Sequence, residues 1–459
     1  MNSQPAKLLA ASITGPKTTG PKTLVENRCI EAVRAFIVLI AILVLAIPGK
    51  VWAQLEFEKP PIEYGKAETH DPVAKLGQAL ASGEIKLNYD SEHGWLPDVL
   101  KHLNISTESQ VLVFSKTSLQ LHKISPRVPR ALYFNDDVYV GWCQHGDLVE
   151  LAATDPEQGA VFYTIDQDST LPPRVIRDQG QCLSCHATNR TQGIPGYLIR
   201  SVYPDYNGRP RTGTRTYVTD QTSPFEQRWG GWYVSGNHGK MRHLGNVRSS
   251  DRLDPELMDT DAGANLESLD GLFDTEPYLT PHSDLVALMV LEHQTQMHNF
   301  IARANFESRI ASYYDQGINQ ALGRPQETVS ESTTRRTAAV GEALIRYMLF
   351  ADEHELTCSV RGTSKYAEQF AISGIRDNQG RSLRELDLQR RLLKYPCSYL
   401  IYSDAFDHLP APVMTFVRKR MSEILTAAEV PEGYEKLSSA DRQAISEILR
   451  DTKPGFLHE

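Results

Sequence analysis

Residues 131–142 read Ala-Leu-Tyr-Phe-Asn-Asp-Asp-Val-Tyr-Val-Gly-Trp, two runs of aromatic and aliphatic residues on either side of an Asn-Asp pair. Aromatic and β-branched residues favour strands, and Asn and Asp favour tight turns, so this stretch predicts a β-hairpin. Similar short runs occur at 111–114, 148–152 and 160–163, separated by turn-forming residues. Together these runs predict an antiparallel meander.

Beyond Pro281 the pattern becomes helical. Apolar residues recur at helical spacing over 284–312, 333–352, 383–394, 411–427 and 439–451. We therefore expect an α+β protein with a β-rich region over 54–179 and a mostly helical region over 282–459. Between them lie residues 180–250, rich in Gly, Arg and aromatic residues, and the strongly acidic residues 251–281, which we expect to form a linker.

The N-terminal residues 1–53 carry the features of an export signal. Arg28 and Arg34 precede an uninterrupted apolar run over 35–47, and Ala53 supplies a small residue at the expected cleavage position. The run spans only about 20 Å as a helix, short of the roughly 30 Å hydrocarbon core of a bilayer. The segment predicts a cleaved signal peptide and a periplasmic protein. An uncleaved anchor in the inner membrane is the alternative.

Composition excludes several classes of protein. The net charge of −9 argues against a general nucleic-acid binder, which needs a basic surface. Six cysteines in 459 residues are too few for a disulfide scaffold. Cys358 and Cys397 could form a disulfide or remain buried thiols. With Cys143, the number of cysteines outside the motif and the leader is odd, so at least one is unpaired or bonded to another chain.

The residues that indicate a function are Cys182-Leu183-Ser184-Cys185-His186. Two thiols separated by two residues can each bond a vinyl group of haem, and the next histidine can bind the iron. With 6 cysteines and 14 histidines in the chain, chance would produce this pattern far less than once. A zinc site would need a second Cys or His pair, and a thioredoxin-like dithiol would follow a βαβ strand; neither context is visible.

On these five residues and the export signal, the chain resembles c-type cytochromes. More loosely, it is similar to the large single-haem cytochrome-c-domain proteins of Gram-negative bacteria, whose activity is unassigned. The resemblance implies one covalent haem c, with Cys182 and Cys185 as thioether attachments and His186 as proximal ligand. It also implies single-electron transfer with a redox partner protein. The alternatives are a haem-dependent periplasmic oxidoreductase with an open or substrate-facing iron, and a haem subunit of a larger redox complex.

A low-spin electron carrier needs a sixth ligand, most often Met or His. Met241 is the first methionine after the motif, between two glycines, and His238 and His243 are competing ligands in the same loop. A polar surface loop is the other interpretation. In the helix predicted from residue 284, His293 and Met297 lie on an apolar stripe and could bind haem or simply belong to the core.

Two further features bear on a haem site. Residues 187–250 hold nine basic and three acidic residues, and arginine suits the carboxylates of haem propionates. Neutralisation by the acidic residues that follow and docking of an acidic partner are alternative roles. Trp229 and Trp232 are expected to wall the haem. Glu292, His293 and His298 are expected to form a polar site if the protein is an enzyme.

Overall fold

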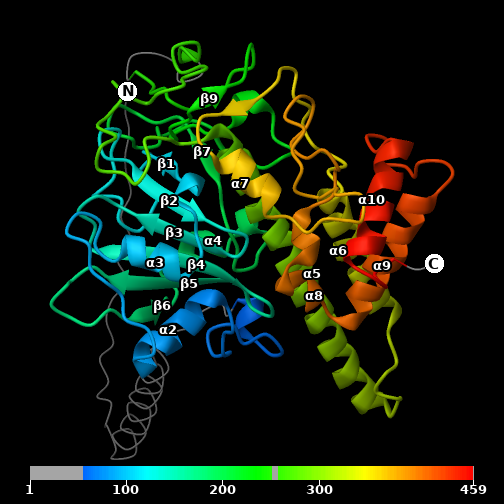
Figure 1. Ribbon diagram of the computed structural model, residues 1–459. Helices are drawn as coiled ribbons and strands as arrows, with labels where there is room; N and C mark the ends of the chain where they lie inside the picture. Colours follow the sequence, from blue (N-terminus) through cyan, green and yellow to red (C-terminus); the bar gives the residue numbers. More distant parts are fainter. Residues whose placement is uncertain (1–54, 251–256, 458–459) are drawn as a thin grey trace, which may run out of the picture. The chain divides into compact units, whose positions relative to one another are not determined.

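The computed structural model describes residues 55–250 and 257–457 (Figure 1). Residues 56–459 form one compact unit, so the β-rich and helical regions share one body. The predicted export signal over 1–53 lies outside the described residues. No helix in the described part of the chain is long and apolar enough to cross a membrane.

The first half contains a six-stranded sheet in which each strand pairs antiparallel with the next, in the order β1-β2-β3-β4-β5-β6. This confirms the predicted meander and the α+β class. The strands are β1 (Val111–Val113), β2 (Arg130–Phe134), β3 (Val138–Trp142), β4 (Leu148–Asp155), β5 (Gly159–Asp166) and β6 (Val175–Arg177). Two short pairs, β7 (Arg200–Val202) with β8 (Thr216–Val218) and β9 (Gly236–Asn237) with β10 (Arg361–Gly362), lie outside it.

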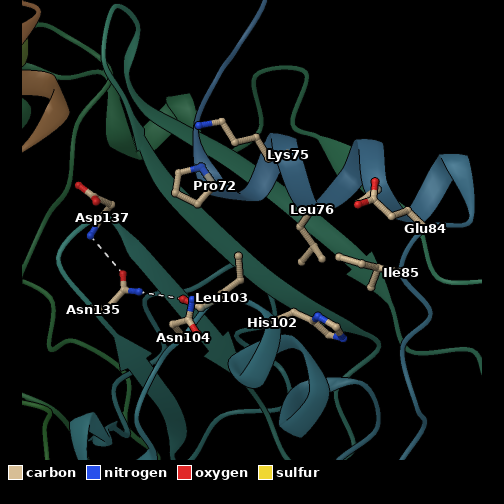
Figure 2. Close-up of a pocket in the computed structure, with 11 residues that line it drawn as sticks. Pro72, Lys75, Leu76, Glu84, Ile85, His102, Leu103, Asn104, Asn135 and Asp137 are labelled. Carbon is tan, nitrogen blue, oxygen red and sulfur yellow. Dashed lines mark hydrogen bonds between the residues drawn. The ribbon is translucent and has the colours of Figure 1, made fainter.

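The β2–β3 turn shows why the Asn-Asp pair ends one strand and starts the next. The Asn135 side-chain oxygen accepts hydrogen bonds from the backbone N–H groups of Asp137, at 3.2 Å, and Val138, at 2.9 Å. Its amide nitrogen donates to the carbonyl oxygen of Leu103 at 2.9 Å (Figure 2). The turn is therefore held both locally and by the segment that follows α3 (Leu96–His102).

Alternation along the strands separates two apolar clusters. Val161 and Tyr163 of β5 belong to one cluster, which also contains residues of α2 (Pro72–Ser82) and α3. Ala160 and Phe162 belong to the other, together with residues of the C-terminal helices. Successive side chains of a strand point to opposite faces, so the sheet separates the two cores.

Helices dominate the second half, as expected. They are α5 (Leu285–Leu322), α6 (Glu331–Met348), α7 (Tyr366–Ile372), α8 (Asp404–Asp407), α9 (Ala411–Thr426) and α10 (Ser439–Thr452). The Asp284 side chain caps α5 by accepting from the N–H groups of Val286 and Ala287, and Gly323, with φ of 63°, ends it. Helix α5 packs on α6, α6 on α9 and α9 on α10.

The helix predicted over 383–394 is absent, and this prediction was wrong. Leu386 and Leu393 instead form a β-bridge, and the Asp387 carboxylate accepts hydrogen bonds from the N–H groups of Gln389 and Arg390. A carboxylate that bonds the backbone two and three residues ahead favours a turn over a helix. The apolar residues of this stretch are buried through a folded-back loop rather than through one helix face.

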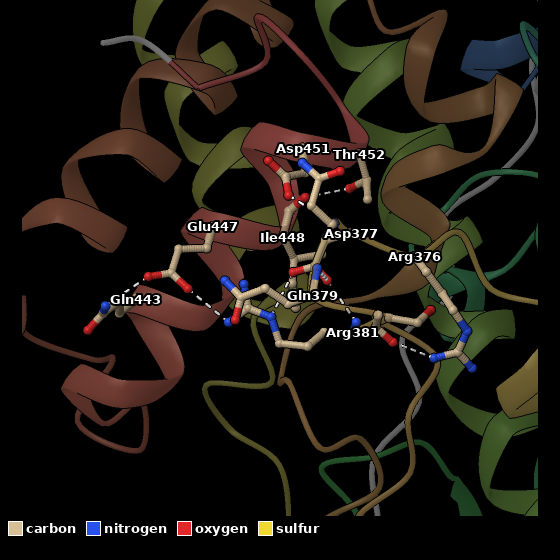
Figure 3. A network of polar contacts seen from close by, with 12 residues as sticks. Arg376, Asp377, Gln379, Arg381, Gln443, Glu447, Ile448, Asp451 and Thr452 are labelled. Atoms are coloured by element: carbon tan, nitrogen blue, oxygen red, sulfur yellow. Dashed lines mark hydrogen bonds and ion pairs between the residues drawn. The ribbon is translucent and has the colours of Figure 1, made fainter.

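Polar contacts hold the preceding loop to the last helix. Arg381 contacts Asp377 at 2.7 Å and Glu447 of α10 at 2.8 Å (Figure 3). The Asp451 carboxylate accepts from the backbone N–H of Asn378 at 3.0 Å. The described part of the acidic stretch, 257–281, is also anchored: Leu269 is fully buried, and the Tyr278 hydroxyl donates to the carbonyl of Pro129.

Candidate functional site

The motif forms one helical turn, α4 (Leu183–His186). The backbone N–H groups of Cys185 and His186 both donate to the carbonyl oxygen of Cys182, at 3.1 and 2.9 Å. The Asp178 carboxylate accepts the N–H of Cys182 at 3.0 Å and so anchors the start of the turn. Residues three and four apart on a helix share a face, so the two thiols and the imidazole belong to one face of this turn.

Both thiols of the motif are unbonded. Cys185 is exposed and Cys182 is half-buried. Burial, with the Asp178 carboxylate nearby, raises the pKa of Cys182 to about 12. A dithiol redox pair works through a thiolate of lowered pKa, so this environment does not favour that alternative. Nor do the described residues group three or more His, Cys, Asp or Glu side chains as ligands for a metal ion.

The imidazole of His186 has a defined orientation. Its Nδ1 atom lies 2.9 Å from the carbonyl oxygen of Gly196, and its ring packs on Phe162 with centroids 4.7 Å apart. A carbonyl only accepts, so Nδ1 carries the proton and Nε2 keeps a lone pair. Burial lowers the pKa of His186, which favours this neutral form. Metal-bound histidines are held in this way, by a backbone carbonyl on the other ring nitrogen.

Gly196 was not identified from the sequence. Its N–H donates to the carbonyl of His186 at 2.8 Å. Two hydrogen bonds therefore hold the Gly196 loop against α4. A Cβ atom at Gly196 would lie 2.4 Å from the side-chain oxygen of Asn299 in α5. That side chain bonds both the N–H and the carbonyl of Tyr197, which fixes the loop against the long helix. The two glycines flanking Ile194 and Pro195 were the available signal.

Charged groups surround the motif. Arg130, Glu150 and Asp178 all act electrostatically on both Cys182 and His186. Arg130 pairs with Glu150 at 2.6 Å, yet its Nε atom is buried with no hydrogen-bond partner. Arg200, one of the predicted arginines, lies within the electrostatic reach of Cys185. The guanidinium groups near the motif therefore come from β2 as well as from the predicted segment.

The loop of Met241 buries its three candidate ligands, Met241, His238 and His243, while Gly239 and Lys240 are exposed. His238 uses both ring nitrogens, with Nδ1 2.8 Å from the carbonyl of Met241 and Nε2 accepting the N–H of Asn265 at 3.0 Å. His243 accepts the N–H of Gly245 on Nδ1, so its Nε2, buried without a partner, carries the proton. Among the described residues, no hydrogen bond or ring contact joins His186 to this loop.

The second group of predicted residues lies inside the helical core. His293 is fully buried, with Nδ1 2.5 Å from the side-chain oxygen of Gln221 and Nε2 2.8 Å from the hydroxyl of Ser398. Burial lowers its pKa to about 3, so it is neutral. Glu292 pairs with Arg228, and His298 bonds the carbonyl of Asp136. Each residue has its own partner, so the three do not converge on one polar site.

The two tryptophans expected to wall the haem and the two C-terminal cysteines complete the predicted residues. Trp229 is fully buried between Phe225 and His243, in the Met241 loop cluster. Trp232 donates its indole N–H to the carbonyl of Arg200 at 2.9 Å. Cys358 and Cys397 are both free thiols, so the disulfide considered from the sequence does not form.

Comparison with known proteins adds no relative. No protein-family model matches the chain, and no curated protein or solved structure matches it. The chemistry of the site must therefore be argued from the motif and from the contacts around it.

Proposed function

We propose that this chain is an exported c-type cytochrome that carries one covalent haem and transfers single electrons. Cys182 and Cys185 would form the two thioether bonds, and His186 would bind the iron. A bound haem would supply a one-electron redox couple. The observation that carries this proposal is the hydrogen bond from His186 Nδ1 to the Gly196 carbonyl, which leaves Nε2 available as a ligand.

The chain's own residues fit the group. One helical turn presents both thiols with the histidine, and the thiols are not joined to each other. Arg130 and Arg200 supply guanidinium groups beside the motif, and Arg130 has a buried Nε without a partner. Planar guanidinium groups suit the carboxylates of haem propionates.

The proposed function includes export to the periplasm and a redox partner protein. Covalent attachment of haem to a Cys-x-x-Cys-His motif takes place outside the bacterial cytoplasm, which agrees with a leader over 1–53 and a periplasmic location. A single-electron carrier needs a donor and an acceptor, so a redox partner protein is expected. If the N-terminal apolar run is not cleaved, it would anchor the protein in the inner membrane.

Attachment is tested by haem staining after denaturing gel electrophoresis of periplasmically expressed protein. Wild-type protein should stain, and Cys182→Ala with Cys185→Ala should not. Cys358→Ala is the matched control, because this thiol lies outside the motif, and it should stain like wild type. Haem that leaves wild-type protein in acid-acetone would contradict covalent attachment.

A second candidate function is a haem oxidoreductase whose iron keeps an open position. The observation that favours it is that His238 and His293 use both ring nitrogens in hydrogen bonds, and that Nε2 of His243 carries a proton. None of the three can bind iron without giving up a contact. A high-spin ferric spectrum with ready cyanide binding would favour this function over the carrier.

A further inference from the structure

A continuous series of aromatic rings leads from the motif to α7. Successive ring centroids are 4.7, 6.5, 4.5, 6.4 and 5.5 Å apart, in the order His186, Phe162, Tyr197, Tyr139, Phe134, Tyr366. Such separations are those of rings in direct contact. The series crosses from α4 over the sheet to α7, and its members belong to three separate parts of the chain.

The series ends at a groove. Phe134 and Tyr366 line a groove of about 410 Å³, together with Phe370 and Arg384. A second groove of about 550 Å³ adjoins it and shares Asn104, Asn135 and Asp137 with it. Figure 2 shows the residues that line this second groove. These volumes are in the range of small-molecule sites, and three aromatic rings line the first groove.

The charged groups of the groove differ in whether they are paired. Arg384 forms an ion pair with Asp136 and stacks over Phe370, with the guanidinium carbon 4.9 Å from the ring centroid. The half-buried Asp137 carboxylate has no hydrogen bond or ion pair among the described residues. It can therefore accept a hydrogen bond from a molecule in the groove.

The surroundings of Asp137 set its charge. Burial and the neighbouring carboxylates of Asp136 and Asp404 raise its pKa to about 7, against the weaker effects of Arg384 and Lys75. Glu84 and His102 also line the second groove. At neutral pH this carboxyl group can therefore either accept or donate a hydrogen bond.

We propose that the groove between the β2–β3 turn and α7 binds a small, neutral hydroxyaromatic molecule of the hydroquinone class. Its ring would pack against Phe134 and Tyr366, and its hydroxyl would donate a hydrogen bond to Asp137. Arg384 disfavours a cationic ligand, and the carboxylates of Asp136 and Asp137 disfavour an anionic one. The choice of a redox-active aromatic ligand rests on the proposed function, because the ring series joins this groove to His186.

The test is hydroquinone binding to the purified full-length protein, measured by titration calorimetry at pH 7. Ser373 lines the groove from an exposed position, so Ser373→Trp should block it and weaken binding at least tenfold without disturbing the core. Ser373→Ala, the matched control, should bind like wild type. Asp137→Asn should weaken binding at least threefold and remove its pH dependence around pH 7.

Equal affinity of wild type and Ser373→Trp would overturn the inference, as would binding of glucose without binding of hydroquinone, since glucose has hydroxyls but no aromatic ring. Haem staining of the same samples separates the two proposals. Wild-type protein that binds hydroquinone but does not stain for haem would contradict only the proposed function. Stained protein that does not bind hydroquinone would contradict only the groove.

Discussion

Arg228 Nη1 and Glu292 Oε2 lie 3.3 Å apart in an ion pair that is almost completely buried. The same guanidinium donates to the carbonyls of Gln221 and Ser223, so it ties the segment that follows the motif to the long helix α5. Glu292 Oε1 is buried without a partner. This arginine is therefore one of the buried polar contacts that join the two regions, beside the Asn299–Tyr197 and His293–Gln221 contacts.

Loss of that arginine should destabilise the whole unit. Arg228→Met leaves the buried carboxyl group of Glu292 and the carbonyl of Ser223 without a donor, and we expect a loss of about 3 kcal/mol in unfolding free energy. Denaturant unfolding measures it. The control is Arg361→Gln, which breaks an exposed pair with Glu267 and should cost less than about 1 kcal/mol. Equal midpoints for the two variants would contradict the assignment.

Gly196→Ala tests the orientation of His186 separately from haem attachment. The new methyl group would collide with Asn299 and displace the carbonyl that holds Nδ1. We expect haem staining to persist, because both thiols remain, but the absorption spectrum and the reduction potential to change. Gly317→Ala is the control: a Cβ meets nothing there, and the helix should gain about 1 kcal/mol. An unchanged spectrum in Gly196→Ala would show that this contact does not orient the ligand.

The pKa of Glu353 predicts that the stability of the protein depends on pH. Burial raises its pKa to about 7 from an ordinary value of 4.5, so ionisation is less favourable in the folded chain than in the unfolded one. The stability that protonated Glu353 gives the folded chain is therefore fully present below pH 4.5 and is lost as pH rises through 7. Glu353→Gln can still accept the N–H of Leu392 and should be more stable than wild type at pH 8, by about 3 kcal/mol.

The comparison needs two pH values and one control. The advantage of Glu353→Gln over wild type in chemical denaturation should disappear at pH 4. Exposed Glu355→Gln should stay within about 0.5 kcal/mol of wild type at both values. An advantage of equal size at pH 4 and pH 8 would mean that packing, and not ionisation, distinguishes the variants.

Met241 remains the predicted distal ligand and has its own test. With a thioether on the iron, ferric protein should be low-spin with a weak far-red sulfur-to-iron band. Met241→Ala should remove the band, lower the reduction potential and admit carbon monoxide, because thioether sulfur favours the ferrous state. Met297→Ala, at a fully buried position in α5, is the control and should keep the band. A band retained in Met241→Ala would exclude this ligand.

The leader predicts a defined N-terminus. Cleavage after Ala53 gives a mature chain that begins at or near Gln54, which mass spectrometry of the periplasmic fraction would detect. Recovery of Met1 or Asn2 in the membrane fraction would establish an anchor instead.

The sequence alone determined what depends on neighbouring residues. The strands of the meander follow from short runs of aromatic and β-branched residues, and Asn135 marks their turn because its side chain bonds backbone groups only two and three residues away. The motif was recognisable for the same reason: Cys182, Cys185 and His186 need only one helical turn to share a face. Helix α5 was visible from its period and its Asp284 cap.

Tertiary structure decided what depends on distant residues. The Gly196 loop is held by Asn299, about a hundred residues further on, and Arg228 meets Glu292 only once α5 is packed. The stretch 383–394 shows the converse, since its apolar spacing suited a helix but the Asp387 turn folded it back as a loop. Burial and long-range contacts change pKa values and hydrogen-bond partners, and neither has a local signature in the sequence.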